Sequence, residues 1–164
     1  MKRSRIGMPT PHMDRRFDTE AFLKSTKYLD WTSPQIRHQK AQLEKELPEG
    51  SPMDRAKQIF IFVRDQIAYR IPDHFLQGKY LQASFLVSYG KGNCVQKSLI
   101  LASLCRAFKI PTRLHFVDII NHLAPPSYTE MYGNYLAWHC YVDIFLDGIW
   151  VAANSDYPQS LFAR

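Results

Sequence analysis

The stretch Gly92-Asn93-Cys94-Val95-Gln96, together with the apolar run that continues to Phe108, decides the fold of this chain. The run is apolar almost all round, which is typical of a helix inside a core rather than on a surface. Asn93 is a favourable N-cap, and Gln96 three residues later completes a capping-box pattern. We therefore expect Cys94 in the first turn of a buried helix, where free backbone N–H groups and the helix dipole favour a thiolate.

A cysteine at this position has two interpretations. A thiolate at a helix N-terminus is a nucleophile suited to covalent catalysis. The alternative is that Cys94 is one more small buried residue, as most cysteines are.

Length and composition predict a globular domain. A chain of 164 residues with 46% hydrophobic residues is long enough for one domain with a real core. No apolar run approaches the roughly 18 residues that a transmembrane helix needs, and no apolar segment follows the basic N-terminus as in a secretory signal. The three cysteines (Cys94, Cys105 and Cys140) are an odd number without CxxC spacing, which favours a reducing compartment and a cytoplasmic location.

Most of the net charge of +6 lies at the N-terminus, where residues 1–16 contribute +4. These residues contain two prolines and little periodicity, so we expect a basic flexible arm over 1–16 and a single domain over 17–164. The remainder is nearly neutral, whereas a nucleic-acid-binding domain normally carries a basic face with stacking aromatic residues. Nucleic-acid binding is therefore not expected as the main role.

Helices precede strands along the chain. Ser33-Pro34 and Ser51-Pro52 are typical helix starts, and alternating β-branched residues after the central helix predict strands. The expected elements are helices over 34–47 and 52–67 and strands over 112–120, 135–146 and 149–154. Asp147-Gly148 is a strong signal for a two-residue hairpin turn between the last two strands. This order predicts an α+β domain, in which N-terminal helices and the central cysteine-bearing helix pack on a small antiparallel sheet.

The hairpin register brings His139 toward two polar residues. With Asp147-Gly148 as the turn, His139 faces Asn154 diagonally on one face of the sheet and, if the strand runs that far, Asp156 directly. A carboxamide or carboxylate beside a histidine orients the imidazole for base chemistry. We expect this face to pack on the central helix and so to approach Cys94. The alternative is a half-buried strand histidine that bonds to a neighbour.

The other two cysteines do not extend this site. Cys105 lies roughly 16 Å beyond Cys94 along the helix. Cys140 points to the opposite face of its strand from His139. A zinc site built from these residues is poorly supported, and no metal or cofactor is expected.

Five segments occur in an order and spacing typical of one known family. They are 56–69, Gly92-Asn93-Cys94, Phe108-Lys109-Ile110-Pro111-Thr112-Arg113, Trp138-His139 and Val142-Asp143-Ile144-Phe145-Leu146-Asp147-Gly148-Ile149-Trp150-Val151. Together they resemble the transglutaminase-like superfamily, and the match extends over residues 55–157. The resemblance implies a papain-like Cys-His-Asp core, with the cysteine at a helix N-terminus and the other two residues on adjacent strands.

Residue by residue, Cys94 matches the nucleophile of that family and His139 its base. The third position, four residues after Trp150, is Asn154, where the family usually has Asp. An Asn can hold the imidazole in one tautomer but gives less support to an imidazolium, and Asp156 is the alternative third residue. The resemblance implies a cysteine-dependent acyl-transfer enzyme that attacks a protein or peptide amide and forms a thioester. Water or an amine would be the acceptor.

Two further functions stay open at this point. Asn154, and the absence of the Asp-Pro-Thr that usually follows in the family, favour a catalytically inactive binding module that keeps the fold. A structural zinc protein or a nucleic-acid-binding protein is the third alternative. The aromatic segment 75–89 and the loop 121–135 are candidate substrate walls, with plain core packing as the alternative.

Overall fold

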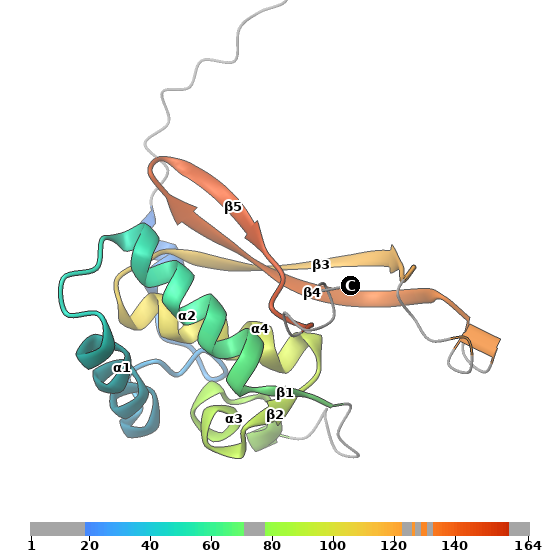
Figure 1. The fold of residues 1–164 in the computed structure, drawn as a ribbon, viewed down its shortest axis with the longest axis horizontal. Helices are drawn as coiled ribbons and strands as arrows, with labels where there is room; N and C mark the ends of the chain where they lie inside the picture. Colours follow the sequence, from blue (N-terminus) through green and yellow to red (C-terminus); the bar gives the residue numbers. More distant parts are fainter. Residues whose placement is uncertain (1–18, 71–77, 123–125, 127–128, 131–132, 158–164) are drawn as a thin grey trace, which may run out of the picture.

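A helical layer packs against one face of a three-stranded sheet (Figure 1). This computed structural model describes residues 19–70, 78–122, 126, 129–130 and 133–157, so the predicted arm over 1–16 lies outside the described residues. The elements in chain order are η1 (Thr19–Leu23), α1 (Pro34–Glu46), α2 (Pro52–Gln66), β1 (Ala68–Tyr69), η2 (Gly78–Leu81), α3 (Ala83–Tyr89), β2 (Lys91–Gly92), α4 (Cys94–Ala107), β3 (Thr112–Ile120), β4 (Tyr135–Leu146) and β5 (Ile149–Ala153). The α+β class predicted from the sequence is confirmed.

Helix α4 lies at the centre of the core. Its residues from Gln96 to Ala107 are all buried, which is the environment that its all-round apolar sequence predicts. Helix α2 packs against it through a buried stripe that includes Ala56, Ile59 and Val63. Burial of each such aliphatic side chain contributes about 1.5–3 kcal/mol relative to exposure, so this contact fixes α4 against α2.

The sheet has the order β3-β4-β5 and is antiparallel throughout. Leu146 pairs with Ile149 and Val142 with Ala153, so the hairpin register predicted from Asp147-Gly148 is confirmed. Strand β5 ends at Ala153, and the residues that follow continue past the paired region. Strands β3 and β4 extend well beyond the helical layer (Figure 1).

The prediction that the face of β4 with His139 packs on the central helix is wrong for most of the strand, although His139 itself does approach Cys94 at the start of α4. The residues that face the core are the alternate ones, and they are all buried: Cys140, Val142, Ile144 and Leu146. The apolar side chains take the helix side because period-two alternation lets only one face of the strand enter the core. The opposite face carries Asp143, which accepts a hydrogen bond from Arg113 Nε at 2.9 Å and lies 3.3 Å from His115 Nδ1.

Two elements near the N-terminus of α4 were not predicted from the sequence. Helix α3 ends at Gly90, whose φ of 71° is the left-handed conformation that glycine adopts at little cost. Strand β2 then pairs in parallel with β1, with Ala68 opposite Lys91 and Tyr69 opposite Gly92. This short ladder joins the end of α2 to the residues directly before Cys94.

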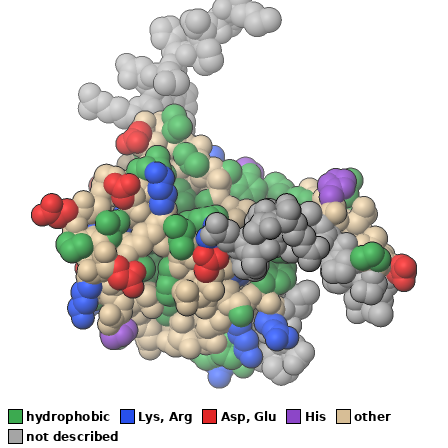
Figure 2. Space-filling view, viewed as in Figure 1, with side chains coloured by type: hydrophobic (Ala, Val, Ile, Leu, Met, Phe, Trp, Pro, Cys, Tyr) green, Lys and Arg blue, Asp and Glu red, His purple; other side chains and the backbone are tan. Residues whose placement is uncertain are grey.

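Outside residues 1–16 the sequence is nearly neutral, and the described surface carries charges of both signs (Figure 2). Acidic and basic side chains both occur across the helical body on the face in Figure 2. Within the described residues, no helix has the length and apolar character needed to cross a membrane.

Candidate active site

A capping box positions Cys94 at the start of α4. The Asn93 side chain accepts a hydrogen bond from the Gln96 backbone N–H at 3.1 Å, and Gln96 Oε1 accepts one from the Asn93 N–H at 3.0 Å. Gln96 Nε2 also donates to Tyr80 O at 2.9 Å, which ties η2 to the same turn. Gly92 is required here because a Cβ at this position would lie 2.6 Å from Gln96 Cβ. The local sequence thus fixes the half-buried Cys94 in the first turn, as predicted.

A β-bulge positions His139. Val117 pairs with His139 and Ile119 with Leu136, so two residues of β4 stand opposite Asp118 alone. One of the two is Trp138, which has a φ of 61° and donates its backbone N–H to Asp118 Oδ1 at 3.1 Å. A left-handed backbone is unusual for a bulky residue, and such strain is typical of functional sites.

The segment after β5 supplies the two polar partners of His139. Asn154 Nδ2 lies 3.1 Å from His139 Nε2, and Asp156 Oδ2 lies 3.6 Å from the same nitrogen. Asn154 is exposed, whereas Asp156 is 2% exposed and His139 is 7% exposed. The structure therefore brings both predicted third residues to one edge of the imidazole, although neither lies in a paired strand.

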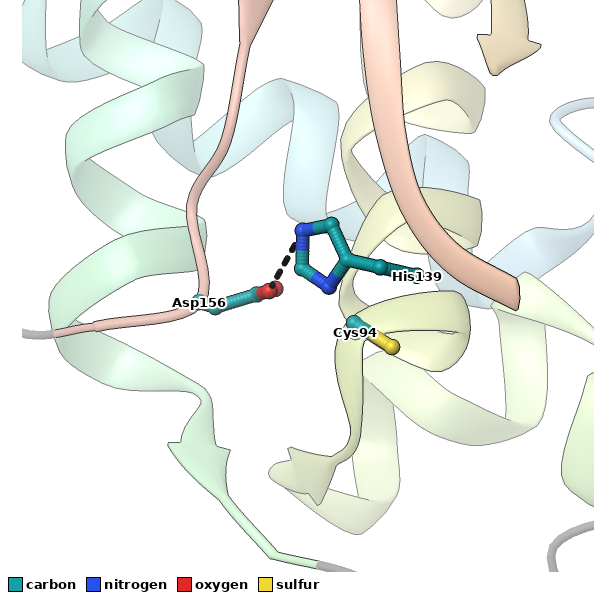
Figure 3. Close-up of side chains that lie close together, drawn as sticks. All are labelled: Cys94, His139 and Asp156. Carbon is teal, nitrogen blue, oxygen red and sulfur yellow. Dashed lines mark ion pairs between the residues drawn. The ribbon is translucent and has the colours of Figure 1, made fainter. Parts of the chain in front are cut away.

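The imidazole lies between Asp156 and Cys94 (Figure 3). Its Nε2 faces the carboxylate, so Nδ1 is the nitrogen on the side of Cys94. Ligand atoms of Cys94, His139 and Asp156 all lie within 4.8 Å of one another. A thiol, an imidazole and a carboxylate in this order match the parts of a nucleophilic triad, and the same three side chains are also potential ligands of a thiophilic metal ion.

Burial dominates the electrostatics of the site. It raises the pKa of the Cys94 thiol, while the backbone N–H of Cys140 lowers it and the charge of Asp156 raises it further. Burial also lowers the pKa of His139. Both shifts favour the neutral thiol and the neutral imidazole over an ion pair. The expected helix-dipole stabilisation of a Cys94 thiolate is thus outweighed by desolvation.

The pKa of Asp156 is also shifted toward the neutral form of the group. Burial raises its pKa to about 7, and the charge of Lys97 lowers it. Asp156 Oδ1 is a buried oxygen without a hydrogen-bond partner in the described part of the chain. Such a group is unusual in a folded protein and often marks a functional site.

The remaining two cysteines do not act as nucleophiles in this arrangement. Burial raises the pKa of Cys105 to about 12, and burial is also the main cause that raises the pKa of Cys140 to about 12. The thiol of Cys105 is fully buried in the core beneath the sheet. Cys140 contributes its backbone instead, since its carbonyl accepts a hydrogen bond from Ser98 Oγ at 3.1 Å.

The predicted substrate walls are only partly described. Residues 75–77 and several residues of 121–135 lie outside the described part of the chain. Tyr80, Phe85 and Tyr89 form a cluster of aromatic rings with centroids 5.0–5.9 Å apart. The backbone carbonyl of Tyr80 also accepts the hydrogen bond from Gln96 Nε2, so this cluster packs beside the turn that carries Cys94.

Comparison with known proteins identifies the family of this chain. A sequence model of the transglutaminase-like superfamily matches residues 41–155, and the chain belongs to this superfamily. Among curated proteins, no sequence matches.

Solved structures share the fold. A proposed cysteine protease from Cytophaga hutchinsonii is similar with a TM-score of 0.62 and 19% identity over 90% of this chain. A proposed protease from Parabacteroides distasonis has a TM-score of 0.51 and 15% identity over 83%. The periplasmic domain of TgpA from Pseudomonas aeruginosa, bound to ethylmercury, has a TM-score of 0.50 and 20% identity over 87%. The chain spans 45%, 26% and 51% of these three chains, so it corresponds to about half or less of each.

One charged residue of the site was missed by the sequence analysis. Lys97 lies one turn after Cys94 and is fully buried, and its charge acts on Asp156. The available signal was a lysine within a helix that is otherwise apolar almost all round. Its partners come from distant segments, so the sequence pattern alone did not identify them.

Proposed function

We propose that this chain is a cysteine-dependent acyl-transfer enzyme, with Cys94 as nucleophile, His139 as base and Asp156 as the residue that orients the imidazole. The observation that carries the proposal is the convergence of these three side chains, which come from α4, β4 and the segment after β5. Membership of the transglutaminase-like superfamily supports a cysteine-type enzyme at the level of the superfamily.

The proposed reaction begins with attack of Cys94 Sγ on the carbonyl carbon of an amide. His139 Nδ1 accepts the thiol proton and then gives it to the departing amine as the C–N bond breaks. The backbone N–H of Cys94, at the free N-terminus of α4, would help to hold the oxyanion. The resulting thioester is resolved by water or by an amine, whose proton passes to His139 and then to the released Cys94 sulfur.

Hydrogen bonding favours Asp156 over Asn154 as the third residue. Asn154 Oδ1 accepts the backbone N–H of Asp156 at 3.2 Å, so the Asn154 amide nitrogen is the end that faces His139. An amide nitrogen donates, which makes Nε2 an acceptor and puts the proton on Nδ1. A base toward Cys94 needs the opposite tautomer, with Nε2–H directed at a carboxylate such as Asp156.

A groove beside the site supports a protein or peptide substrate. The open groove has a volume of about 510 Å³ and lies between α2 and the β4–β5 hairpin. Apolar residues such as Phe60, Ile61 and Val151 line it, and Asn154 lies among its lining residues. An extended chain with apolar side chains fits such a groove, and Asn154 joins its lining to His139, whose Nε2 lies 3.1 Å from Asn154 Nδ2.

The first experiment is the alkylation of Cys94 by iodoacetamide in the wild-type protein and in His139→Ala. We expect the wild-type rate near pH 7 to exceed the variant rate by about tenfold or more, because a positioned base removes the thiol proton. The labelled peptide is quantified by mass spectrometry, and the deeply buried Cys105 serves as an internal control. Assays with peptide amides, with and without an added amine, then separate hydrolysis from transfer.

A catalytically inactive binding module is the second candidate function. The raised pKa of Cys94 favours it, as does the distance of 3.6 Å from His139 to Asp156, which exceeds the usual hydrogen-bond range. Equal alkylation rates in the wild type and His139→Ala, both rising only above the pKa of an ordinary thiol, would establish this function instead.

We also propose a cytoplasmic location for this chain. The proposal is supported by the free state of Cys94, Cys105 and Cys140. Free thiols are typical of reducing compartments. Fractionation of the cells that produce the protein would test it, and recovery outside the cytoplasm would contradict it.

A further inference from the structure

Three side chains of the candidate active site are spaced like the ligands of a single metal ion. One ligand atom from each of Cys94, His139 and Asp156 lies within 4.8 Å of the other two. Zn²⁺ binds sulfur at about 2.3 Å and nitrogen or oxygen at about 2.0–2.2 Å, so its tetrahedral ligands lie roughly 3.3–3.7 Å apart. Small side-chain rotations would therefore bring all three ligand atoms to one ion.

The kinds of donor atom select a thiophilic divalent ion. A thiolate, an imidazole nitrogen and a carboxylate oxygen suit Zn²⁺ and its heavier congener Cd²⁺, whereas Mg²⁺ and Ca²⁺ prefer oxygen ligands alone. The imidazole nitrogen on the side of Cys94 is Nδ1, which has a free lone pair when Nε2 carries the proton (Figure 3). One thiolate and one carboxylate also balance the charge of a divalent ion, and a neutral complex is the form that a buried site favours.

Asp156 contributes an oxygen that lacks another partner. Its side chain is 2% exposed, and its Oδ1 has no hydrogen-bond partner within the described residues. Oδ2 lies 3.6 Å from His139 Nε2, which is beyond the usual hydrogen-bond range. Buried carboxylates are normally hydrogen-bonded, paired with a charge or bound to a metal. A cation between Asp156 and Cys94 would satisfy this group.

The burial of the three residues leaves a path for an ion. His139 and Asp156 are buried, whereas Cys94 is only half-buried and opens the cluster to solvent. Cys105 and Cys140 are not members of the cluster. The expectation of no metal from the sequence rested on the spacing of the three cysteines, and this cluster uses only one of them.

We propose that Cys94, His139 and Asp156 bind a thiophilic divalent ion such as Zn²⁺, and that the bound ion reversibly blocks the candidate active site. The Cys94 thiol gives its proton to solvent as the metal–sulfur bond forms, and the hydrated ion releases water as the protein ligands bind. The sulfur lone pair that would attack an amide and the imidazole lone pair that would accept the proton are then both occupied. The metal site rests on the geometry, and its inhibitory effect rests on the proposed function.

The first test is a titration of the full chain with Co²⁺, a spectroscopic substitute for Zn²⁺. We expect a near-ultraviolet charge-transfer band, which requires a cobalt–sulfur bond, together with the visible bands of tetrahedral Co²⁺. Added Zn²⁺ should abolish both sets of bands, and Cys94→Ser should lack the charge-transfer band. Absence of that band from the wild-type protein would overturn the proposal.

The second test measures which residues hold Zn²⁺. Competition with a chromophoric chelator gives the affinity of each variant. His139→Ala and Asp156→Asn should each weaken binding by about tenfold or more, since loss of even an outer-shell partner costs roughly 10–100-fold. His38→Ala and Asp147→Asn, at exposed positions outside the site, are the matched controls and should bind as the wild type does. Wild-type affinity in His139→Ala and Asp156→Asn would place the ion on the thiol alone and overturn the proposal.

Alkylation of Cys94 tests the inhibitory effect and separates it from the proposed function. Saturating Zn²⁺ should slow labelling by iodoacetamide about tenfold or more, and EDTA should restore the rate. An unchanged rate in the loaded protein would contradict the inhibition. Equal metal-free rates in the wild type and His139→Ala, together with a cobalt–sulfur band, would contradict the proposed enzyme and leave the metal site standing. A faster wild type without the band would contradict the metal site alone.

A measurement on the wild-type protein covers the case in which the variants do not fold. X-ray absorption at the zinc edge of the loaded protein should show one sulfur at about 2.3 Å and nitrogen or oxygen ligands at about 2.0–2.2 Å. A ligand shell without sulfur, or one with two or more sulfurs, would overturn the proposal.

Discussion

The backbone N–H of Asp156 donates to the Asn154 side chain at 3.2 Å, and this contact decides which end of the Asn154 amide meets His139. The two residues are therefore unequal, although both reach the same imidazole edge. Asn154 is exposed and turns its amide nitrogen toward the ring, whereas Asp156 is buried and, when ionised, can only accept a hydrogen bond from the ring.

Substitution of these two residues is expected to have opposite effects. Asp156→Asn removes the only carboxylate at this edge among the described residues and should lower turnover by about a hundredfold or more, because it favours the wrong tautomer. Asn154→Asp restores the residue usual in the family and should preserve or raise turnover. Steady-state kinetics on a peptide amide measure both, and a larger loss in Asn154→Asp than in Asp156→Asn would assign the third role to Asn154.

The contribution of Asp156 to the stability of the protein is expected to decline as the pH rises from about 4 to 7. The pKa of Asp156 is about 7 in the folded state, so stability is lost as the pH rises from its unfolded value of about 4. Burial lowers the pKa of Lys97 to about 8, which by itself raises stability above pH 8, but the raised pKa values of Cys105 and Cys140, each about 12, lower stability above about pH 9. Each effect is on the order of 1 kcal/mol or more, since one pKa unit corresponds to about 1.4 kcal/mol.

Urea unfolding at intervals from pH 4 to pH 10 checks this prediction. Asp156→Asn should flatten the curve between pH 4 and 7 and leave its shape above pH 8 unchanged. An Asp156→Asn curve that still declines from pH 4 to pH 7 as in the wild type would assign the decline to other groups.

The backbone of Trp138 gives a third prediction. A φ of 61°, as at Trp138, is tolerated by Asn and is strained for β-branched residues. The Trp138 side chain is 75% exposed, so its packing contributes little to the stability of the fold. Trp138→Asn should keep the free energy of unfolding within about 0.5 kcal/mol of the wild type, whereas Trp138→Val should lower it by about 1–2 kcal/mol. Trp138→Val should also slow alkylation of Cys94, because His139 follows directly. Equal stability of the two variants would show that the left-handed conformation is not maintained in solution.

A fourth prediction concerns the turn before Cys94. Gly92→Ala would place a methyl group 2.6 Å from Gln96 Cβ and so disturb the capping box. We expect a loss of about 1–2 kcal/mol in the free energy of unfolding and slower alkylation of Cys94. Gly78→Ala is the matched control, because a Cβ there meets nothing within 4 Å. An equal loss of unfolding free energy in Gly92→Ala and Gly78→Ala would show that the loss comes from replacing any glycine, not from the capping box.

Local signals account for most of what the sequence predicted correctly. The Asn93–Gln96 capping box and the Asp147-Gly148 turn act over a few residues, and both appear in the structure as expected. The bulge at Trp138 was not predictable in this way, because nothing in an aromatic residue signals a left-handed backbone. The partners of Lys97 were hidden for another reason: Ile67 and Asp156 are distant in sequence and approach α4 only after the layers have packed.

Asp156 comes from the segment after β5, and this late position has a consequence for biosynthesis. A chain that emerges from the ribosome N-terminus first completes α4 and its thiol well before β4, β5 and Asp156 are available. During that interval Cys94 has neither base nor carboxylate beside it and is an ordinary cysteine. Reactivity toward amides, and toward the cell's other nascent chains, would begin only when the final hairpin has docked.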